Sequence, residues 1–169
     1  GFDLVVSVNL SPRQFASPDL LHDITGVLRQ AGVNPARMEL EITESMLLGE
    51  DQHVLGVMRE LSALGLTMAL DDFGTGYSNL AYLQRFPIHT LKIDKTFIQD
   101  TDANRSLAEL IVSLSTLMKL TAVAEGVETQ EQLDWVAKRG IAQYQGYLYA
   151  RPMPVQALTD WLLSHPPKP

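Results

Sequence analysis

Short apolar runs alternate with longer amphipathic stretches along the 169 residues of the chain, and few residues separate them. Short, mostly apolar runs of this kind are typical of parallel strands that are buried on both faces. The six candidate strands are Leu4–Leu10, Met38–Thr43, Thr67–Asp72, Thr90–Asp94, Thr121–Glu125 and Tyr144–Tyr149. The alternation therefore predicts a series of βα units, which fold as a parallel sheet covered by helices.

Capping signals mark the helices expected between these strands. One helix is expected to have Ser17 as its N-cap and Pro18 at its first helical position, and to end at Gly32. Gly65 follows a helix expected over 51–64, where a left-handed C-cap belongs. The other helices are expected over 78–84 and 103–119, from the Thr129–Gln132 capping box to Gly140, and from Pro154 onward.

The βα series fits either an open doubly wound sheet or a closed barrel, and periodicity alone does not choose between them. A closed (β/α)8 barrel needs eight strands and about 250 residues. No GxGxxG or GKS/T phosphate loop follows the first strand, which argues against a dinucleotide-binding sheet. The hydrophobic content of 46% is enough for one core. We therefore expect one domain over 1–169 and no second domain.

Charge and composition limit the partners. The formal net charge is −7, which argues against a nucleic acid polymer, since such binding requires a basic face. The chain has no cysteine, so a metal ion must be held by oxygen or imidazole. No apolar run approaches the roughly 18 residues of a membrane span, and no signal-peptide pattern begins the chain. We expect a cytoplasmic domain without direct membrane insertion.

Polar side chains stand at or near the carboxyl ends of the expected strands. Residues two apart on a strand share a face, and in a barrel these strand ends meet at the C-terminal mouth, where active sites lie. Carboxylates gathered there repel unless cations intervene, and an oxygen-rich set favours magnesium or manganese. The strand-end residues are Asn9, Glu41, Asp71, Lys92, Asp94, Glu125 and Gln145.

Two adjacent carboxylates strengthen the metal hypothesis. Asp71 and Asp72 are followed by Gly74 and Gly76, which make a backbone turn easy. Consecutive carboxylates at such a turn can reach two ions about 3.5–4 Å apart, the arrangement that activates water in a phosphoryl displacement. The sequence is equally compatible with a simple tight turn at this position.

Structural roles stay open for the other polar residues as well. Lys92 can serve only to neutralise carboxylates. Glu125 and Glu128 stand before the helix expected from Thr129, and a helix N-terminus favours negative charge. Each of these residues taken alone is compatible with a purely structural role.

Taken together, the motifs resemble the EAL domain family, and they occur in family order from Val5 to Pro154. They are VNLS (8–11), ELEITE (39–44), DDFGTGYS (71–78), LKID (91–94), AEGVET (124–129) and QGYL (145–148). The resemblance implies a (β/α)8 TIM-like barrel of EAL type, with about six of its eight βα units in this chain. The Glu-Ala-Leu signature of the family is expected upstream of Gly1. We therefore expect the C-terminal portion of an EAL domain, without its first strands.

The resemblance implies a metal-dependent phosphodiesterase that hydrolyses cyclic di-GMP to linear pGpG with two Mg²⁺ or Mn²⁺ ions. It implies Asn9, Glu41 and Asp71 as ligands of one ion, and Asp71, Asp72 and Glu125 as ligands of the other. Lys92 corresponds to the lysine that holds the attacking water. The remaining implied roles are catalytic for Glu125, Asp94 and Gln145, substrate-binding for Asn9 and Gln145, supporting for Glu128, and anchoring of the loop 72–79 for Glu44.

Two other functions stay open. Some domains of this family bind cyclic di-GMP without cleaving it, and an unrelated enolase-type barrel would also combine a lysine with magnesium carboxylates. The filled metal and lysine positions favour the enzyme. The resemblance further implies a homodimer and an upstream sensory or GGDEF domain, through which the parent protein can be tethered to the inner membrane. We expect residues 1–169 alone to be poorly active and to hold metal weakly.

Overall fold

The computed structural model describes residues 2–47, 52–74, 80–98 and 102–165. It shows an α/β fold built on one parallel sheet of six strands in the order β1-β2-β3-β4-β5-β6. The strands are β1 Val6–Asn9, β2 Met38–Thr43, β3 Thr67–Phe73, β4 Thr90–Ile93, β5 Thr121–Ala124 and β6 Gln143–Tyr144. Because each strand pairs with the next one in sequence, the predicted βα series is confirmed.

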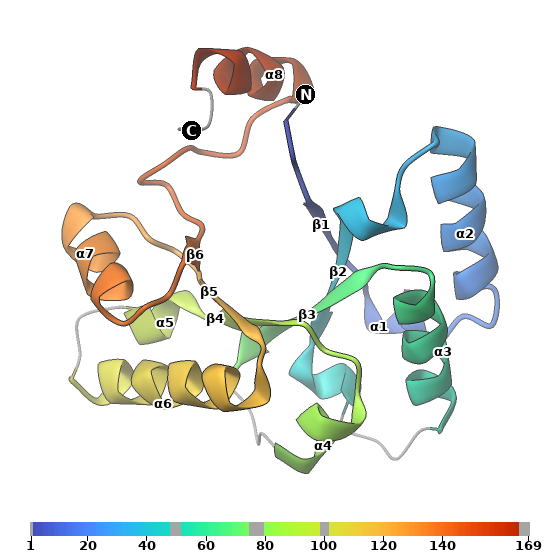
Figure 1. The fold of residues 1–169 in the computed structure, drawn as a ribbon, viewed down its shortest axis with the longest axis horizontal. Coiled ribbons are helices and arrows are strands. Elements are labelled where there is room, and N and C mark those ends of the chain that lie inside the picture. The colour runs from blue at the N-terminus through green and yellow to red at the C-terminus, as the bar shows by residue number, and fades with distance from the viewer. Residues whose placement is uncertain (1, 48–51, 75–79, 99–101, 166–169) are drawn as a thin grey trace.

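Helices cover the outer side of the curved sheet, which forms a half-barrel (Figure 1). α8 lies apart from the other helices, near the N-terminus. No described helix combines the length and the apolar character that crossing a membrane requires. The helices are α1 Pro12–Phe15, α2 Leu20–Ala31, α3 Gln52–Ala63, α4 Leu80–Arg85, α5 Lys95–Ile98, α6 Asp102–Met118, α7 Gln130–Lys138 and α8 Val155–Ser164, with 3-10 turns η1 Pro35–Arg37 and η2 Glu44–Leu47.

The caps agree with the sequence except at the start of α2. Thr129 and Gln132 form the predicted capping box of α7, and Gly32 ends α2 in the left-handed conformation, with φ 64°. The prediction of Ser17 as the N-cap is wrong, because α2 begins at Leu20. The Ser17 hydroxyl instead accepts the Asp19 N–H within the preceding turn. Two short helices, α1 and α5, were not predicted.

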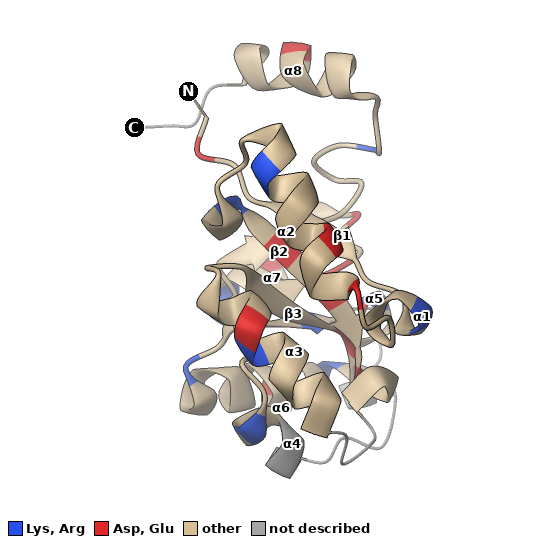
Figure 2. Cartoon of the chain, turned by 90° about the vertical axis from the view of Figure 1, so that its right-hand side faces the viewer, with Lys and Arg blue, Asp and Glu red and all other residues tan. Residues whose placement is uncertain are grey.

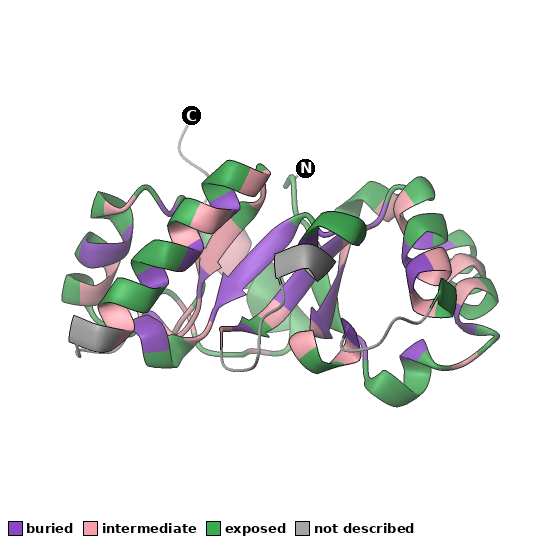
Figure 3. Ribbon diagram, turned by 90° about the horizontal axis from the view of Figure 1, so that it is seen from below, coloured by how far each residue is buried: buried purple, intermediate pink, exposed green. Residues whose placement is uncertain are grey.

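The core lies between the sheet and its covering helices, as the burial pattern in Figure 3 shows. Leu40 and Ile42 of β2 are buried there. A fully buried side chain of this size contributes about 1.5–3 kcal/mol, so the apolar face of β2 is fixed against the helices. Strand alternation then turns Glu39 and Glu41 toward the interior of the half-barrel. Burial of one face thus positions the polar residues of the other.

The last strand is shorter than its predicted range of Tyr144–Tyr149. β6 ends at Tyr144, and the chain then turns, with the Tyr149 N–H donating to the Gly146 carbonyl. A Cβ atom added at Gly146 would lie 2.1 Å from the carbonyl oxygen of Val127. Glycine therefore permits a close backbone approach that pulls the chain out of the strand.

Candidate active site

Lys92 of β4 lies at the centre of the polar cluster and is 5% exposed. Its Nζ atom is 2.8 Å from Glu41 Oε2, 3.1 Å from Asp71 Oδ1 and 2.7 Å from Glu125 Oε1. These carboxylates come from β2, from β3 and from the residue that follows β5. The structure therefore brings together four side chains that the sequence placed at four separate strand ends.

Lys92 is a cation in this environment. Burial acts to lower the pKa of Lys92, but the hydrogen bonds to Glu125 and Glu41 outweigh it and raise that pKa above its ordinary value. The ammonium group can therefore donate hydrogen bonds to the carboxylates around it. A single positive charge shared among several carboxylates also leaves the cluster with an excess of negative charge.

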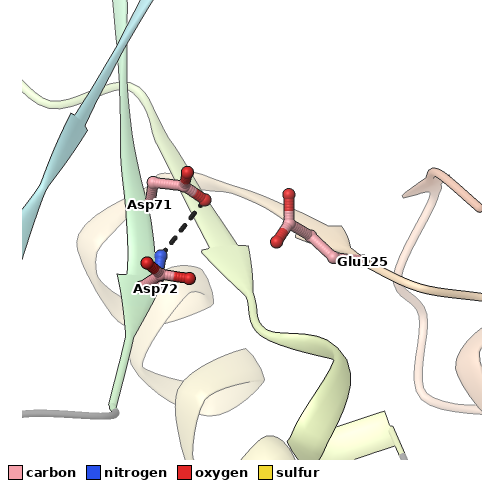
Figure 4. Close-up of side chains that lie close together, drawn as sticks. All are labelled: Asp71, Asp72 and Glu125. Carbon is pink, nitrogen blue, oxygen red and sulfur yellow. Dashed lines mark hydrogen bonds between the residues drawn. The ribbon is translucent and has the colours of Figure 1, made fainter. Parts of the chain in front are cut away.

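Three carboxylates form the densest part of the cluster (Figure 4). Asp71, Asp72 and Glu125 each offer one oxygen within 4.8 Å of the others. Asp72 has a left-handed backbone conformation, with φ 54°, and its N–H donates to Asp71 Oδ1 at 3.1 Å. The register of β3 against β4 also shifts between Leu70 and Phe73. The backbone therefore turns at this point, and two consecutive aspartates contribute to one cluster.

The electrostatics of these carboxylates favour a bound cation. Burial, together with the neighbouring carboxylates of Asp71 and Asp94, raises the pKa of Asp72. Burial also raises the pKa of Glu125, because it outweighs the hydrogen bond from Lys92. The donor set offers only oxygen, which suits a hard divalent cation. The residues present therefore fit the magnesium or manganese that the resemblance implies.

Gln145 and Asp94 lie at the margin of the cluster. Gln145 Nε2 donates to Glu125 Oε1 at 2.8 Å, so the amide fixes the orientation of that carboxylate. Asp94 follows β4 and accepts hydrogen bonds from the Thr96 N–H at 2.9 Å and the Thr96 hydroxyl at 2.6 Å. Asp94 therefore orders the start of α5 while its charge acts on Asp72.

The remaining predicted residues are Asn9, Glu128 and Glu44. Asn9 is exposed and pairs in register with Glu41 on β2. The exposed Glu128 lines the groove described below. Both carboxylate oxygens of Glu44 are buried and have no hydrogen-bond partner among the described residues. Positions 75–79 of the loop that Glu44 was predicted to anchor lie outside the described residues.

Glu39 was not assigned a role from the sequence, although it supports the site. Its Oε2 accepts from the Thr90 hydroxyl at 2.7 Å and its Oε1 from the Ser7 hydroxyl at 3.0 Å. Glu39 thus links β2 to β1 and reaches β4 across β3, where Ala69 is fully buried and small. Its spacing two residues before Glu41 on the same strand face was the available signal.

A groove of about 800 Å³ opens beside the carboxylate cluster. Asp72, Glu125 and Gln145 form part of its lining, and Tyr147 and Arg151 form another part. Figure 2 shows the acidic residues of β2 in red. A ligand in the groove would therefore contact a divalent-cation site and, in the same cavity, an arginine.

Fold and site together define a parallel α/β half-barrel protein with a carboxylate cluster that could hold a metal ion and a buried lysine at the carboxyl ends of its strands. The EAL domain family model matches residues 1–152. The chain belongs to the EAL domain family.

Individual relatives agree with this assignment. The chain is 38% identical over 164 residues to the cyclic di-GMP phosphodiesterase PdeR of Escherichia coli K12, a match that covers 95% of this chain and 25% of PdeR. The solved PaMucR phosphodiesterase, in complex with c-di-GMP, is 38% identical with a TM-score of 0.88, and the match covers 92% of this chain and 64% of that one.

A further solved structure contains a metal ion. BlrP1 of Klebsiella pneumoniae, a complex with manganese and cyclic di-GMP, is 32% identical with a TM-score of 0.79. That match covers 88% of this chain and 39% of BlrP1. The chain spans between 20% and 25% of the length of the curated relatives it matches.

Proposed function

We propose that the protein is a metal-dependent phosphodiesterase that hydrolyses cyclic di-GMP to linear pGpG. The observation that carries the proposal is the buried, charged Lys92 held within 3.1 Å of carboxylates from β2, from β3 and from the residue after β5, in a cluster able to bind a divalent cation. Two relatives support the choice of cyclic di-GMP as the substrate. PdeR is a cyclic di-GMP phosphodiesterase, and the PaMucR phosphodiesterase was solved in complex with c-di-GMP.

Two Mg²⁺ or Mn²⁺ ions are proposed to bind the oxygen cluster. Bound ions would supply Lewis-acid activation of water and of the leaving oxygen. The manganese complex of BlrP1 supports this choice of metal. The ligands proposed are Asn9, Glu41 and Asp71 for one ion, and Asp71, Asp72 and Glu125 for the other.

The side chains of the chain itself position the reactants. Lys92 donates hydrogen bonds as an ammonium group, which suits it to hold the attacking water and to offset charge on the phosphate. Gln145 keeps Glu125 in place through its hydrogen bond. Asn9 and Gln145 are proposed to contact substrate, with Glu128 in support and Glu44 as the anchor of the loop 72–79. Asp94 adds negative charge beside Asp72.

Two alternative functions are less well supported. An enolase-type reaction requires a lysine that accepts a proton, whereas Lys92 is held as a cation by its carboxylate partners. A receptor that binds cyclic di-GMP without cleaving it does not require this complete set of carboxylates around a lysine. The enzyme therefore remains the proposal, and the receptor is an outcome of its test.

We also propose the biological setting of this domain. The bifunctional diguanylate cyclase/cyclic di-GMP phosphodiesterase MucR of Pseudomonas aeruginosa is 39% identical over 160 residues, which supports a link to a GGDEF or sensory domain in the full-length protein. A homodimer and a cytoplasmic location are proposed from the family resemblance and from the nature of the substrate, an internal nucleotide signal.

The test is metal-dependent turnover of cyclic di-GMP by the full-length protein, with pGpG quantified by chromatography. We expect cleavage with Mg²⁺ or Mn²⁺, little turnover with Ca²⁺, whose coordination is larger and looser, and none in excess chelator. Equal turnover in chelator would contradict the metal mechanism. Tight binding without cleavage in every metal would favour the receptor.

A further inference from the structure

Two side-chain contacts cross β3 on the inner face of the half-barrel. Glu41 Oε2 lies 2.8 Å from Lys92 Nζ, and Glu39 Oε2 accepts a hydrogen bond from the Thr90 hydroxyl at 2.7 Å. Both contacts join β2 to β4, although β3 lies between these strands (Figure 1). Residues two apart on a strand share a face. The contact of Glu39 with Thr90 is therefore the step that precedes the contact of Glu41 with Lys92.

The backbone pairing of the sheet is irregular at Lys92. The regular register of β3 against β4 is interrupted between Leu70 and Phe73. Two residues of β3, Asp71 and Asp72, lie there opposite one residue of β4, Lys92. An extra residue in one strand disrupts the hydrogen-bond ladder at that point. The position of Lys92 relative to β2 and β3 therefore depends on side-chain contacts as well as on the ladder.

The contact of Glu39 with Thr90 fixes the strands just before this irregularity. Thr90 is buried, with an exposed fraction of 6%. A hydroxyl that donates to a carboxylate forms a stronger hydrogen bond than one between neutral groups. Glu39 is itself held by the Ser7 hydroxyl, at 3.0 Å. The contact therefore ties β1, β2 and β4 together two residues before Lys92.

Ala69 leaves the space over which the contact passes. It pairs in register with Glu41 on one side and with Thr90 on the other. It shares the inner face of β3 with Asp71, which contacts Lys92. Neighbouring strands are about 4.8 Å apart, so a contact from β2 to β4 spans roughly twice that distance over the β3 side chain. Ala69 is fully buried, and a larger side chain there would occupy the volume that the contact uses.

We propose that Glu39 is a positioning residue for Lys92. Through Thr90, and over the small Ala69, Glu39 sets the separation of β2 and β4 at which the lysine meets Glu41. The inference rests on the proposed function and adds to it residues that act on the cluster from below. Because Glu39 acts on the geometry of the lysine and not on the substrate, its loss should slow turnover and leave KM nearly unchanged.

The test measures kcat and KM for cyclic di-GMP with the full-length protein in saturating Mn²⁺, with folding of each variant checked by circular dichroism. We expect Glu39→Ala and Thr90→Val to lower kcat on the order of tenfold to a hundredfold, because a misplacement of about 1 Å has effects of this size. KM should stay within about twofold. Glu39→Gln and Thr90→Ser should retain most of the rate, since an amide oxygen still accepts and a serine hydroxyl still donates.

A purely structural contact gives a different result. Reduced stability with unchanged kcat in Glu39→Ala and Thr90→Val would overturn the positioning role. A rate in Thr90→Ser as low as that of Thr90→Val would contradict it too, because the hydroxyl would then not be the determinant. Glu60→Ala is the matched control, since it removes an exposed carboxylate from α3, and it should change neither kcat nor KM.

Ala69→Val tests the path of the contact. It should lower kcat about as much as Glu39→Ala, and the double variant should be no slower than the slower single variant, because both changes remove the same contact. Losses that multiply would refute the role of Ala69. The Glu39 and Thr90 variants decide the inference if Ala69→Val does not fold. Wild-type protein without turnover would overturn the proposed function and the positioning role with it, whereas an active wild type with equally active variants overturns the positioning role alone.

Discussion

The middle and outer strands of the sheet hold their polar residues in different ways. All four residues of β4 are buried, whereas all four residues of β1 are exposed. Lys92 on β4 therefore has its position fixed by the burial of its strand and by three carboxylates. Asn9 on β1 depends on the strand register with β2. The centre of the site is thus built by the core, and its margin by individual hydrogen bonds.

The largest effect should come from the centre. Lys92→Ala removes the cation that holds three carboxylates, so we expect turnover of cyclic di-GMP to fall about a thousandfold. Without metal, the unpaired carboxylates should also lower the free energy of unfolding by about 3 kcal/mol, and Mn²⁺ should restore part of that loss. Turnover and urea unfolding with and without Mn²⁺ measure both effects.

The matched control is Lys138→Ala, which removes an exposed lysine from α7. We expect this variant to keep both turnover and stability. Near-normal turnover in Lys92→Ala would refute the water-positioning role, and unchanged stability without metal would refute the view that the lysine balances the cluster.

A smaller effect should separate a proposed central metal ligand from a proposed outer one. We expect Asp71→Asn to lower Mn²⁺ affinity about tenfold or more, because it removes the carboxylate that the two ions are proposed to share. Asn9→Ala should lower it only a few-fold, since β1 is exposed and its amide carries no charge. Calorimetric titration of Mn²⁺ into each full-length variant, with Asp19→Asn as a surface control, measures the order. Equal losses for the two variants would show that the outer strand matters as much as the centre.

The same contrast explains what the sequence predicted well. The range predicted for β2, Met38–Thr43, agrees with the structure at both ends, because its apolar and polar residues alternate as they do in a strand with one face on the core. β6 was predicted too long, since it ends where Gly146 meets Val127. That contact joins two segments that are separated in the sequence, so the pattern of residues along the chain could not predict it.

The site shows the same division. Strand alternation and strand ends were enough to predict that Lys92, Glu41 and Asp71 lie together. The role of Glu39 could not be predicted, because its partner Thr90 lies across an intervening strand and the contact depends on sheet register. Asp94 was expected beside Lys92 on one strand face, but its carboxylate accepts hydrogen bonds from Thr96 at the start of α5.

The smallest expected effect concerns the two hydrogen bonds that the Glu39 carboxylate accepts. Glu39 accepts from Thr90, which is buried on β4, and from Ser7, which is exposed on β1. Because Thr90 is buried and the half-buried Glu39 carboxylate is only partly open to water, Thr90→Val should cost about 1–3 kcal/mol of unfolding free energy. Ser7→Ala should cost about 0.5 kcal/mol or less, because water can replace an exposed hydroxyl.

Urea unfolding of both variants and of the double variant tests this ordering. Ser113→Ala is the control, because the Ser113 hydroxyl donates a local hydrogen bond within α6, to the Glu109 carbonyl at 2.9 Å. If the outer bond is replaceable by water, the two losses should add within about 0.5 kcal/mol. A loss for Ser7→Ala as large as that for Thr90→Val would mean that Glu39 holds β1 as firmly as β4. Asn9 lies two residues from Ser7 on the same strand face and would then be positioned by the core as well. The distinction between centre and margin would not hold for the ion that is proposed to bind Asn9, Glu41 and Asp71.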